Sequence, residues 1–192
     1  MTALILGLLI FLGVHSVRIF ADGWRTQTRA RIGEQAWKGA YSVLSLLGFV
    51  LLVWGYGQAR QQPVVLWASP TWTRHLAALL TLPAFIMIFA ANVPGNAIKS
   101  RLKHPMVLGV KVWAAAHLLA NGRVEHLVLF GAFLAWSVLD FRSCRQRDRA
   151  LGVTYPPGNA AATVRTVIVG AALWAAFAFW AHGWLIGVKP FG

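Results

Sequence analysis

The chain has 192 residues, of which 58% are apolar and 12% are charged, and its formal net charge is +13. A soluble domain carries about 25% charged residues, so the composition excludes an ordinary soluble protein, while the apolar content excludes a disordered one. The single cysteine, Cys144, excludes a disulfide scaffold. Nucleic-acid binding would account for the charge but not for the long apolar runs. We therefore predict one integral membrane domain over 1–192, with the lipid bilayer as its partner and no nucleic acid.

The apolar runs predict an all-α, polytopic bundle of transmembrane helices, since a helix needs about 20 apolar residues to cross the bilayer. We predict six spans, at about 2–20, 38–58, 75–95, 105–121, 124–141 and 163–187. The first run lacks a basic start and a cleavage site, so we expect a permanent helix rather than a secretory signal. Pro83 lies inside the third span, where it is expected to kink the helix.

The basic residues predict how the six spans are oriented, because Lys and Arg collect on the cytoplasmic side of short loops. One side would hold thirteen of them: Arg18, Arg25, Arg29, Arg31, Lys38, Lys99, Arg101, Lys103, Arg142, Arg145, Arg147, Arg149 and Arg165. The other side would hold four: Arg60, Arg74, Arg123 and Lys189. We therefore expect both termini on the periplasmic or exterior side of a bacterial inner membrane, and Cys144 in a reducing compartment.

Polar residues within the spans are candidates for function, because an ionisable group in a membrane is costly. Here they are chiefly histidines: His15, His75, His104, His117, His126 and His182. The five carboxylates are expected at span ends or in loops: Asp22, Glu34, Glu125, Asp140 and Asp148. A proton or cation transporter usually needs an intramembrane carboxylate, so this pattern disfavours that class.

Two of these histidines, His15 and His117, lie within otherwise apolar helices and are the predicted metal ligands. Zinc normally recruits a fuller ligand set, whereas haem needs one or two axial imidazoles and apolar walls. Arg18 follows His15 by three residues on the same helical face, and Lys111 approaches the same side of the membrane. We predict a haem b site with these cations at the propionates. With a helical rise of about 1.5 Å per residue, the two histidines are expected to differ in membrane depth by about 8 Å.

The other histidines have simpler interpretations. His75 and His126 stand at span ends, which favours interfacial positions, and His182 neighbours Trp184 at the outer interface. His104 precedes Pro105, so it is expected to cap a helix. It also stays a candidate cofactor-binding residue. The sequence leaves open whether one haem or two is bound.

Four segments resemble the NnrU family of bacterial membrane proteins. They are His15-Ser16-Val17-Arg18, Lys103-His104-Pro105-Met106-Val107-Leu108-Gly109, Trp113-Ala114-Ala115-Ala116-His117-Leu118-Leu119-Ala120-Asn121-Gly122 and His182-Gly183-Trp184-Leu185-Ile186-Gly187-Val188. The resemblance covers nearly the whole chain, and it implies a link to denitrification and nitric oxide metabolism. A more distant similarity to plant zeta-carotene isomerase involves the first histidine and the fourth span.

The similarity to the isomerase implies haem b held by two histidines, which match His15 and His117, and cis–trans isomerisation of a lipophilic polyene. In that enzyme a cysteine lies one turn before the second histidine. Ala114 stands at this position here, so thiolate ligand switching does not transfer to this chain. The two resemblances together imply nitric oxide and a lipophilic small molecule as candidate partners.

Two further hypotheses about function remain open. A basic-His-Pro motif followed by glycine, as at Lys103–Gly109, resembles isoprenylcysteine methyltransferases and sterol reductases, which implies a haem-free enzyme with His104 at a cofactor pocket. The other hypothesis is a non-enzymatic assembly factor for a respiratory complex, which predicts tolerance of substitution at every intramembrane histidine.

Overall fold

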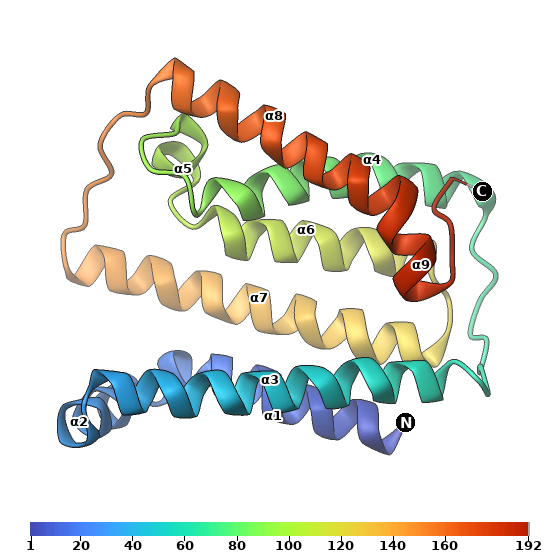
Figure 1. Cartoon of the computed structure of the whole chain (residues 1–192), viewed down its shortest axis with the longest axis horizontal. Helices are drawn as coiled ribbons and strands as arrows, with labels where there is room; N and C mark the ends of the chain where they lie inside the picture. The colour runs from blue at the N-terminus through green and yellow to red at the C-terminus, as the bar shows by residue number, and fades with distance from the viewer. Residues whose placement is uncertain (192) are drawn as a thin grey trace.

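A computed structural model describes residues 1–191, and its regular elements in this range are helices joined by loops (Figure 1). They are α1 (Thr2–Phe20), α2 (Asp22–Ile32), α3 (Glu34–Ala59), α4 (Thr71–Ala90), α5 (Ala97–Leu102), α6 (Pro105–Ala120), α7 (Val124–Ala150), α8 (Ala160–Ala176), the π-helical η1 (Phe177–Ala181) and α9 (His182–Ile186). The all-α prediction is confirmed.

Five helices are long and apolar enough to cross a membrane: Thr2–Phe20, Glu34–Ala59, Thr71–Ala90, Val124–Ala150 and Ala160–Ile186, the last of which joins α8, η1 and α9. They match five of the six predicted spans. The remaining predicted span corresponds to α6, an apolar helix of 16 residues. The protein is therefore a multi-pass membrane protein by its helix composition.

The helices extend beyond the apolar runs that predicted them. α7 continues to Ala150 instead of ending near residue 141, so the basic run from Arg142 to Arg149 is helical. α2 and α5 were not predicted at all. Hydropathy detects contact with lipid rather than helix, and arginine is a good helix former outside the bilayer. α4 continues through Pro83.

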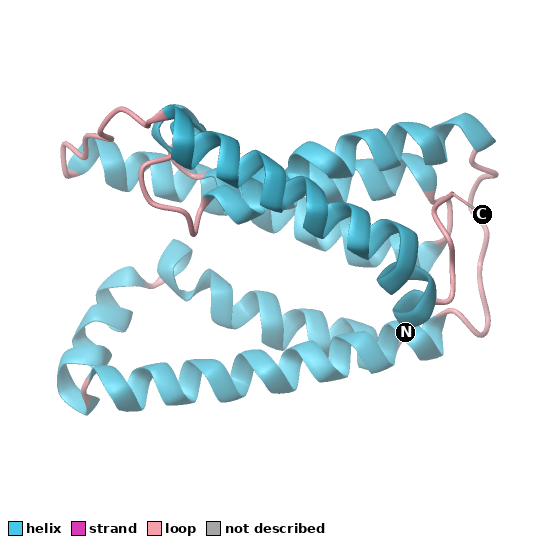
Figure 2. Cartoon of the chain, turned by 45° about the horizontal axis from the view of Figure 1, so that its top comes forward, coloured by secondary structure: helices cyan, strands magenta, loops and turns pink. Residues whose placement is uncertain are grey.

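The helices form two groups joined by α7. α1 packs on α3, whereas α4 packs on both α6 and α8, and α7 contacts α6 on one side and α1 on the other (Figures 1 and 2). Both chain termini lie at the same end of the bundle (Figure 1). We call the other end, which holds α2, α5 and the α7–α8 connection, the basic end, and the end with the termini the opposite end.

Small residues let the helix backbones approach closely. A Cβ atom built on Gly7 would lie 2.4 Å from the backbone nitrogen of Leu52, and one on Gly55 would lie 2.3 Å from that of Leu4. Glycine at helix crossings is typical of packing inside membranes, where close van der Waals contact replaces the hydrophobic effect. These contacts fix α1 against α3 and thereby set the position of His15.

A loop at the opposite end is hydrogen-bonded to the turn between α6 and α7. The Leu66 N–H donates to the Gly122 carbonyl over 2.8 Å, and the Val124 N–H donates to the Val64 carbonyl over 3.0 Å. In the same turn, the Asn121 amide Nδ2 donates to the His117 carbonyl over 2.8 Å. These bonds hold the C-terminal end of α6, and with it His117, against the start of α7.

Candidate cofactor site

His15 and His117 present their rings in the same way. His15 Nδ1 lies 2.6 Å from the Phe11 carbonyl oxygen, and His117 Nδ1 lies 2.8 Å from the Trp113 carbonyl oxygen. A carbonyl oxygen only accepts, so Nδ1 is the protonated nitrogen in both rings. The Nε2 atom then keeps its lone pair, which is the arrangement that a metal-ligating imidazole needs.

Aromatic rings connect the two imidazoles across the bundle. His15 lies 4.3 Å from the Phe11 ring, and His117 lies 5.0 Å from the Trp113 ring. Phe133 of α7 completes the connection, because its ring centroid lies 6.0 Å from that of Phe11 and 5.5 Å from that of Trp113. We call these five residues of α1, α6 and α7 the aromatic interior.

The two histidines lie at different heights along α7. His15 packs edge-on against Trp136 with centroids 6.1 Å apart, whereas His117 stacks on Phe130 at 4.5 Å. Phe130 and Trp136 are six residues apart, which corresponds to about 9 Å along the helix axis. The offset agrees with the depth difference of about 8 Å expected from the sequence. His15 is the one nearer the basic end.

Two buried polar atoms lie near His15, one on Trp136 and one close to Tyr41. Among the described residues, Trp136 Nε1 and Ser45 Oγ are buried and have no hydrogen-bond partner. Ser45 lies one turn after Tyr41, whose ring is 5.3 Å from that of His15. Buried donors in native proteins are nearly always satisfied, so the unpaired Trp136 Nε1 is a hydrogen-bond donor left unused beside His15.

The two predicted propionate partners lie toward the basic end and have protein partners there. Arg18 Nε is 3.8 Å from the Asp22 carboxylate, and the Arg18 side chain is 54% exposed. Lys111 Nζ lies 4.9 Å above the centre of the Phe141 ring. Both cations therefore add positive charge at that end, but neither is placed against His15 or His117 by these contacts.

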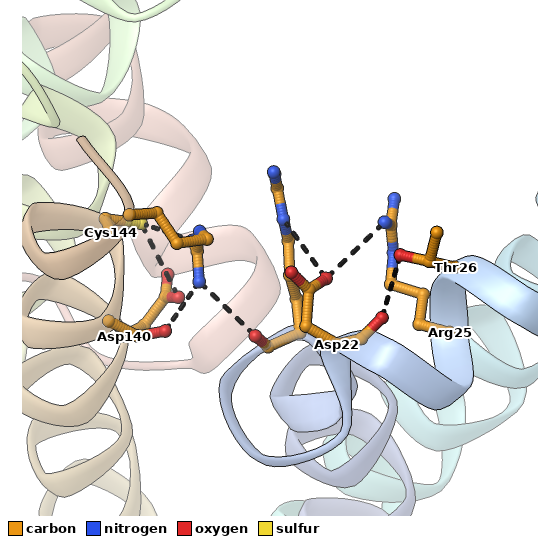
Figure 3. Close-up of polar contacts among 8 residues, drawn as sticks. Asp22, Arg25, Thr26, Asp140 and Cys144 are labelled. Atoms are coloured by element: carbon orange, nitrogen blue, oxygen red, sulfur yellow. Dashed lines mark hydrogen bonds and ion pairs between the residues drawn. The ribbon is translucent and has the colours of Figure 1, made fainter. Parts of the chain in front are cut away.

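A polar cluster joins the α1–α2 corner to α7 at the basic end (Figure 3). Arg147 donates to the Arg18 carbonyl at 3.3 Å, and its other terminal nitrogen lies 3.0 Å from Cys144 Sγ. Asp22 also pairs with Arg25 at 3.7 Å. Cys144 is a free thiol in this cluster, so the positive charges here hold helices together as well as marking one side of the bundle.

His104 belongs to a separate set of residues, which we call the His104 cluster: Lys103, His104, Asp148 and Tyr155. His104 Nε2 lies 2.8 Å from Asp148 Oδ2, and the Tyr155 hydroxyl donates to the same oxygen over 3.0 Å. His104 stands at the N-cap position of α6, as expected, but its side chain makes no cap hydrogen bond and binds Asp148 instead. Burial and the bond to Asp148 raise the pKa of Tyr155 to about 12.

The backbone just before His104 is strained. Lys103 has φ 68° and ψ −54°, and it is the one non-glycine residue with positive φ in the described chain. The His104 N–H donates to the Leu102 carbonyl over 2.8 Å, which makes a γ-turn of the rare hand. This turn lets α6 begin directly after α5 and places His104 beside the end of α7.

The remaining histidines differ in their surroundings. His75 is exposed, as an interfacial residue would be, and His182 Nδ1 lies 2.6 Å from the Val188 carbonyl oxygen. His126 lies in the first turn of α7, at a helix end as expected, but its side chain is packed inside the protein and only 8% exposed. Beside it, Glu125 is 1% exposed, although the sequence placed it simply at a helix end. Its burial depends on packing against other helices, which no local sequence signal reveals.

The fold and site define a multi-pass helical membrane protein with two imidazoles in an aromatic interior. Within residues 1–191, no group of three or more His, Cys, Asp and Glu side chains is arranged to hold a metal ion. Residues 3–190 match the model of the NnrU protein family. The chain therefore belongs to the NnrU family, which confirms the resemblance. No curated protein and no solved structure matches it.

Proposed function

We propose that this NnrU-family membrane protein binds haem b through His15 and His117. The observation that carries the proposal is the matched pair of imidazoles. Both have Nδ1 bound to a main-chain carbonyl, both keep the Nε2 lone pair, and both lie in the aromatic interior. Apolar and aromatic walls suit a macrocycle, and a porphyrin supplies the other iron ligands that the protein lacks.

The residues around the imidazoles fit such a group. Phe133 packs against the rings of both Phe11 and Trp113, so its side chain would form part of the wall around the haem. Trp136 Nε1 would donate to a propionate beside His15. Arg18 and Lys111 add compensating positive charge toward the basic end.

Haem bound here would supply an iron centre able to take up nitric oxide or to act on a lipophilic polyene. His15 and His117 would hold that group between α1 and α6. Ala114 is fully buried one turn before His117, so no thiolate is available at that position to replace the imidazole. We propose that the reaction is linked to nitric oxide metabolism or to haem-dependent isomerisation.

The same proposal includes six membrane spans, with α6 as the short one. A chain that crosses the membrane an even number of times has both termini on the same side. This agrees with both termini lying at one end of the bundle (Figure 1). The basic end would face the cytoplasm of a bacterial inner membrane. Alkaline phosphatase, which is active only in the periplasm, should be active when it is fused after residue 192. A reporter that is active only in the cytoplasm should be inactive when it is fused at the same position. The reverse pattern would contradict this orientation.

The test of haem binding is the absorption spectrum of the full-length protein purified from haem-replete cells. We expect a Soret band of six-coordinate b haem and about one haem per chain by the pyridine haemochrome assay. Protein that is colourless after this preparation, and that takes up no haem when haem is added, would overturn the proposal.

A haem-free enzyme remains the second candidate, and the His104 cluster is the observation that favours it. Asp148 orients His104, and Lys103 lies over the Tyr155 ring at 5.8 Å, so basic and acid–base groups stand together at the membrane surface. This candidate predicts that S-adenosylmethionine or a nicotinamide nucleotide raises the unfolding temperature. No shift with either compound would exclude it.

A further inference from the structure

Arg165 is a charged residue inside a candidate membrane span. The span Ala160–Ile186 contains no other Lys or Arg and no Asp or Glu, and the Arg165 residue is exposed. None of the ion pairs found within residues 1–191 involves Arg165. A charged side chain in a membrane helix is costly unless an opposite charge meets it. Arg165 is therefore a position at which an anion from outside the chain would be stabilising.

A shallow apolar groove lies along Arg165, and Arg165 forms part of its wall. The groove has a volume of about 600 Å³ and is lined by Ala160, Ala161, Val164, Arg165, Ile168 and Val169. Apart from the arginine, these residues are alanine, valine and isoleucine, and they extend over about 14 Å of helix. An arginine stem packs along such a surface while its guanidinium reaches the polar headgroups. The groove therefore suits a molecule with an anionic head and an apolar tail.

The groove faces away from the helix on which α8 packs. Ala162, Thr166 and Gly170 recur every four residues of α8 and are buried, and a Cβ atom on Gly170 would lie 2.8 Å from the Cα atom of Ile86 in α4. Val164 and Ile168 of the groove are instead 56% and 62% exposed. Since α8 lies along α4 at the edge of the bundle (Figure 1), the groove is open to the bilayer, whose lipids have such heads and tails.

The charges of the basic end favour an anionic lipid head over a zwitterionic one. Around α2, two carboxylates neutralise nearby cations: Asp22 pairs with Arg18 and Arg25, and Glu34 with Arg29 and Lys38. On α5, α7 and α8, five arginines take part in none of the ion pairs found within residues 1–191: Arg101, Arg142, Arg145, Arg149 and Arg165. This excess of positive charge attracts an anionic head and repels the cationic part of a zwitterionic one.

We propose that the α8 groove binds an anionic phospholipid. The phosphate would pair with the Arg165 guanidinium, whose planar fork matches the phosphate oxygens, and an acyl chain would lie along Val164 and Ile168. The site is independent of the haem proposal, because none of its residues belongs to the aromatic interior. It assigns a ligand to the one Lys, Arg, Asp or Glu residue of this span.

The head is tested by titrating dioleoylphosphatidylglycerol or dioleoylphosphatidylcholine into the full-length protein in a neutral detergent. The readout is the shift of the unfolding midpoint, which needs no haem. We expect phosphatidylglycerol to bind about tenfold more tightly than phosphatidylcholine, and Arg165→Gln to remove most of that difference. Arg29→Gln is the matched control, because Arg29 lies at the same end but is already paired with Glu34 at 2.7 Å, so it should keep the difference.

The groove is tested with Ala161→Phe, since Ala161 lines it and is exposed. Ala176→Phe is the control, because Ala176 is an exposed alanine of α8 outside the lining. We expect Ala161→Phe to weaken phosphatidylglycerol binding about fivefold and Ala176→Phe to leave it unchanged. Glycerol phosphate, which has the head without the tails, should bind at least about tenfold more weakly than the lipid.

Four results would each overturn the proposal. They are equal binding of the two lipids, an equal loss of lipid preference in Arg165→Gln and Arg29→Gln, equal effects of the two phenylalanine variants, and binding of glycerol phosphate as tight as that of the lipid.

Discussion

The aromatic interior and the His104 cluster use histidine in contrasting ways. In the aromatic interior, a main-chain carbonyl on the same helix takes Nδ1, and Nε2 of His15 and His117 is left with its lone pair. In the His104 cluster, Nε2 itself is bound to Asp148, which ties the start of α6 to the end of α7. The difference is that His15 and His117 each keep a ring nitrogen that no protein group occupies, whereas His104 is already paired and holds helices together.

The largest expected effect is the loss of haem from His15→Ala or His117→Ala. Either variant removes an axial ligand, so we expect haem content to fall about tenfold or more, with a five-coordinate spectrum for what remains. His75→Ala is the control, because His75 is exposed and lies outside the aromatic interior. If both variants retained the six-coordinate spectrum, His15 and His117 would not be the iron ligands, and the proposed difference between the aromatic interior and the His104 cluster would be contradicted.

Phe133 tests whether the space between the imidazoles is where the macrocycle lies. Phe133→Trp puts a larger ring between Phe11 and Trp113, and we expect haem content to fall about fivefold. Phe133→Leu leaves room and should bind haem as the wild type does. Haem content is measured by the pyridine haemochrome assay on equal amounts of folded protein. Equal haem content in Phe133→Trp and Phe133→Leu would show that the haem does not lie next to Phe133.

Asp148 tests the other side of the comparison. Asp148→Asn weakens the bonds from His104 and Tyr155, so we expect the free energy of unfolding to fall by about 1–2 kcal/mol. The Soret band should not change. Asp22→Asn is the control, because this carboxylate lies at the same end but is 44% exposed and should contribute little. A loss of haem in Asp148→Asn would show that the His104 cluster belongs to the cofactor site.

The smallest effect is the contribution of Tyr155 to stability at high pH. Its pKa is raised from 10.0 to about 12 in the folded protein, so the bond to Asp148 stabilises the fold below pH 10 and is lost as the pH rises through 12. Tyr155→Phe has no hydroxyl to ionise, so the variant should lose less stability than the wild type as the pH rises from 10 to 12. Unfolding midpoints between pH 9 and 12 measure it, and identical profiles for wild type and variant would contradict the assignment.

The sequence predicted the features that depend on contact with lipid. Five spans and the special position of His15 and His117 follow from hydropathy, because an ionisable residue in an apolar run has no local explanation. The burial of Glu125 and the pairing of His104 with Asp148 were missed, since both depend on which helices pack together. Trp136 and Tyr41 were missed for the same reason: an aromatic residue in a span gives no signal of which ring it will face.

The claim that His15 and His117 both bind the haem iron is tested most directly by pulsed electron paramagnetic resonance. The sample is the oxidised, haem-loaded protein made with ¹⁵N-histidine, and the quantity measured is the hyperfine coupling between the iron and the histidine nitrogens. We expect two coordinated imidazole nitrogens in the wild type and one in each of His15→Ala and His117→Ala. Two coordinated imidazoles that persist when either histidine is replaced would contradict it.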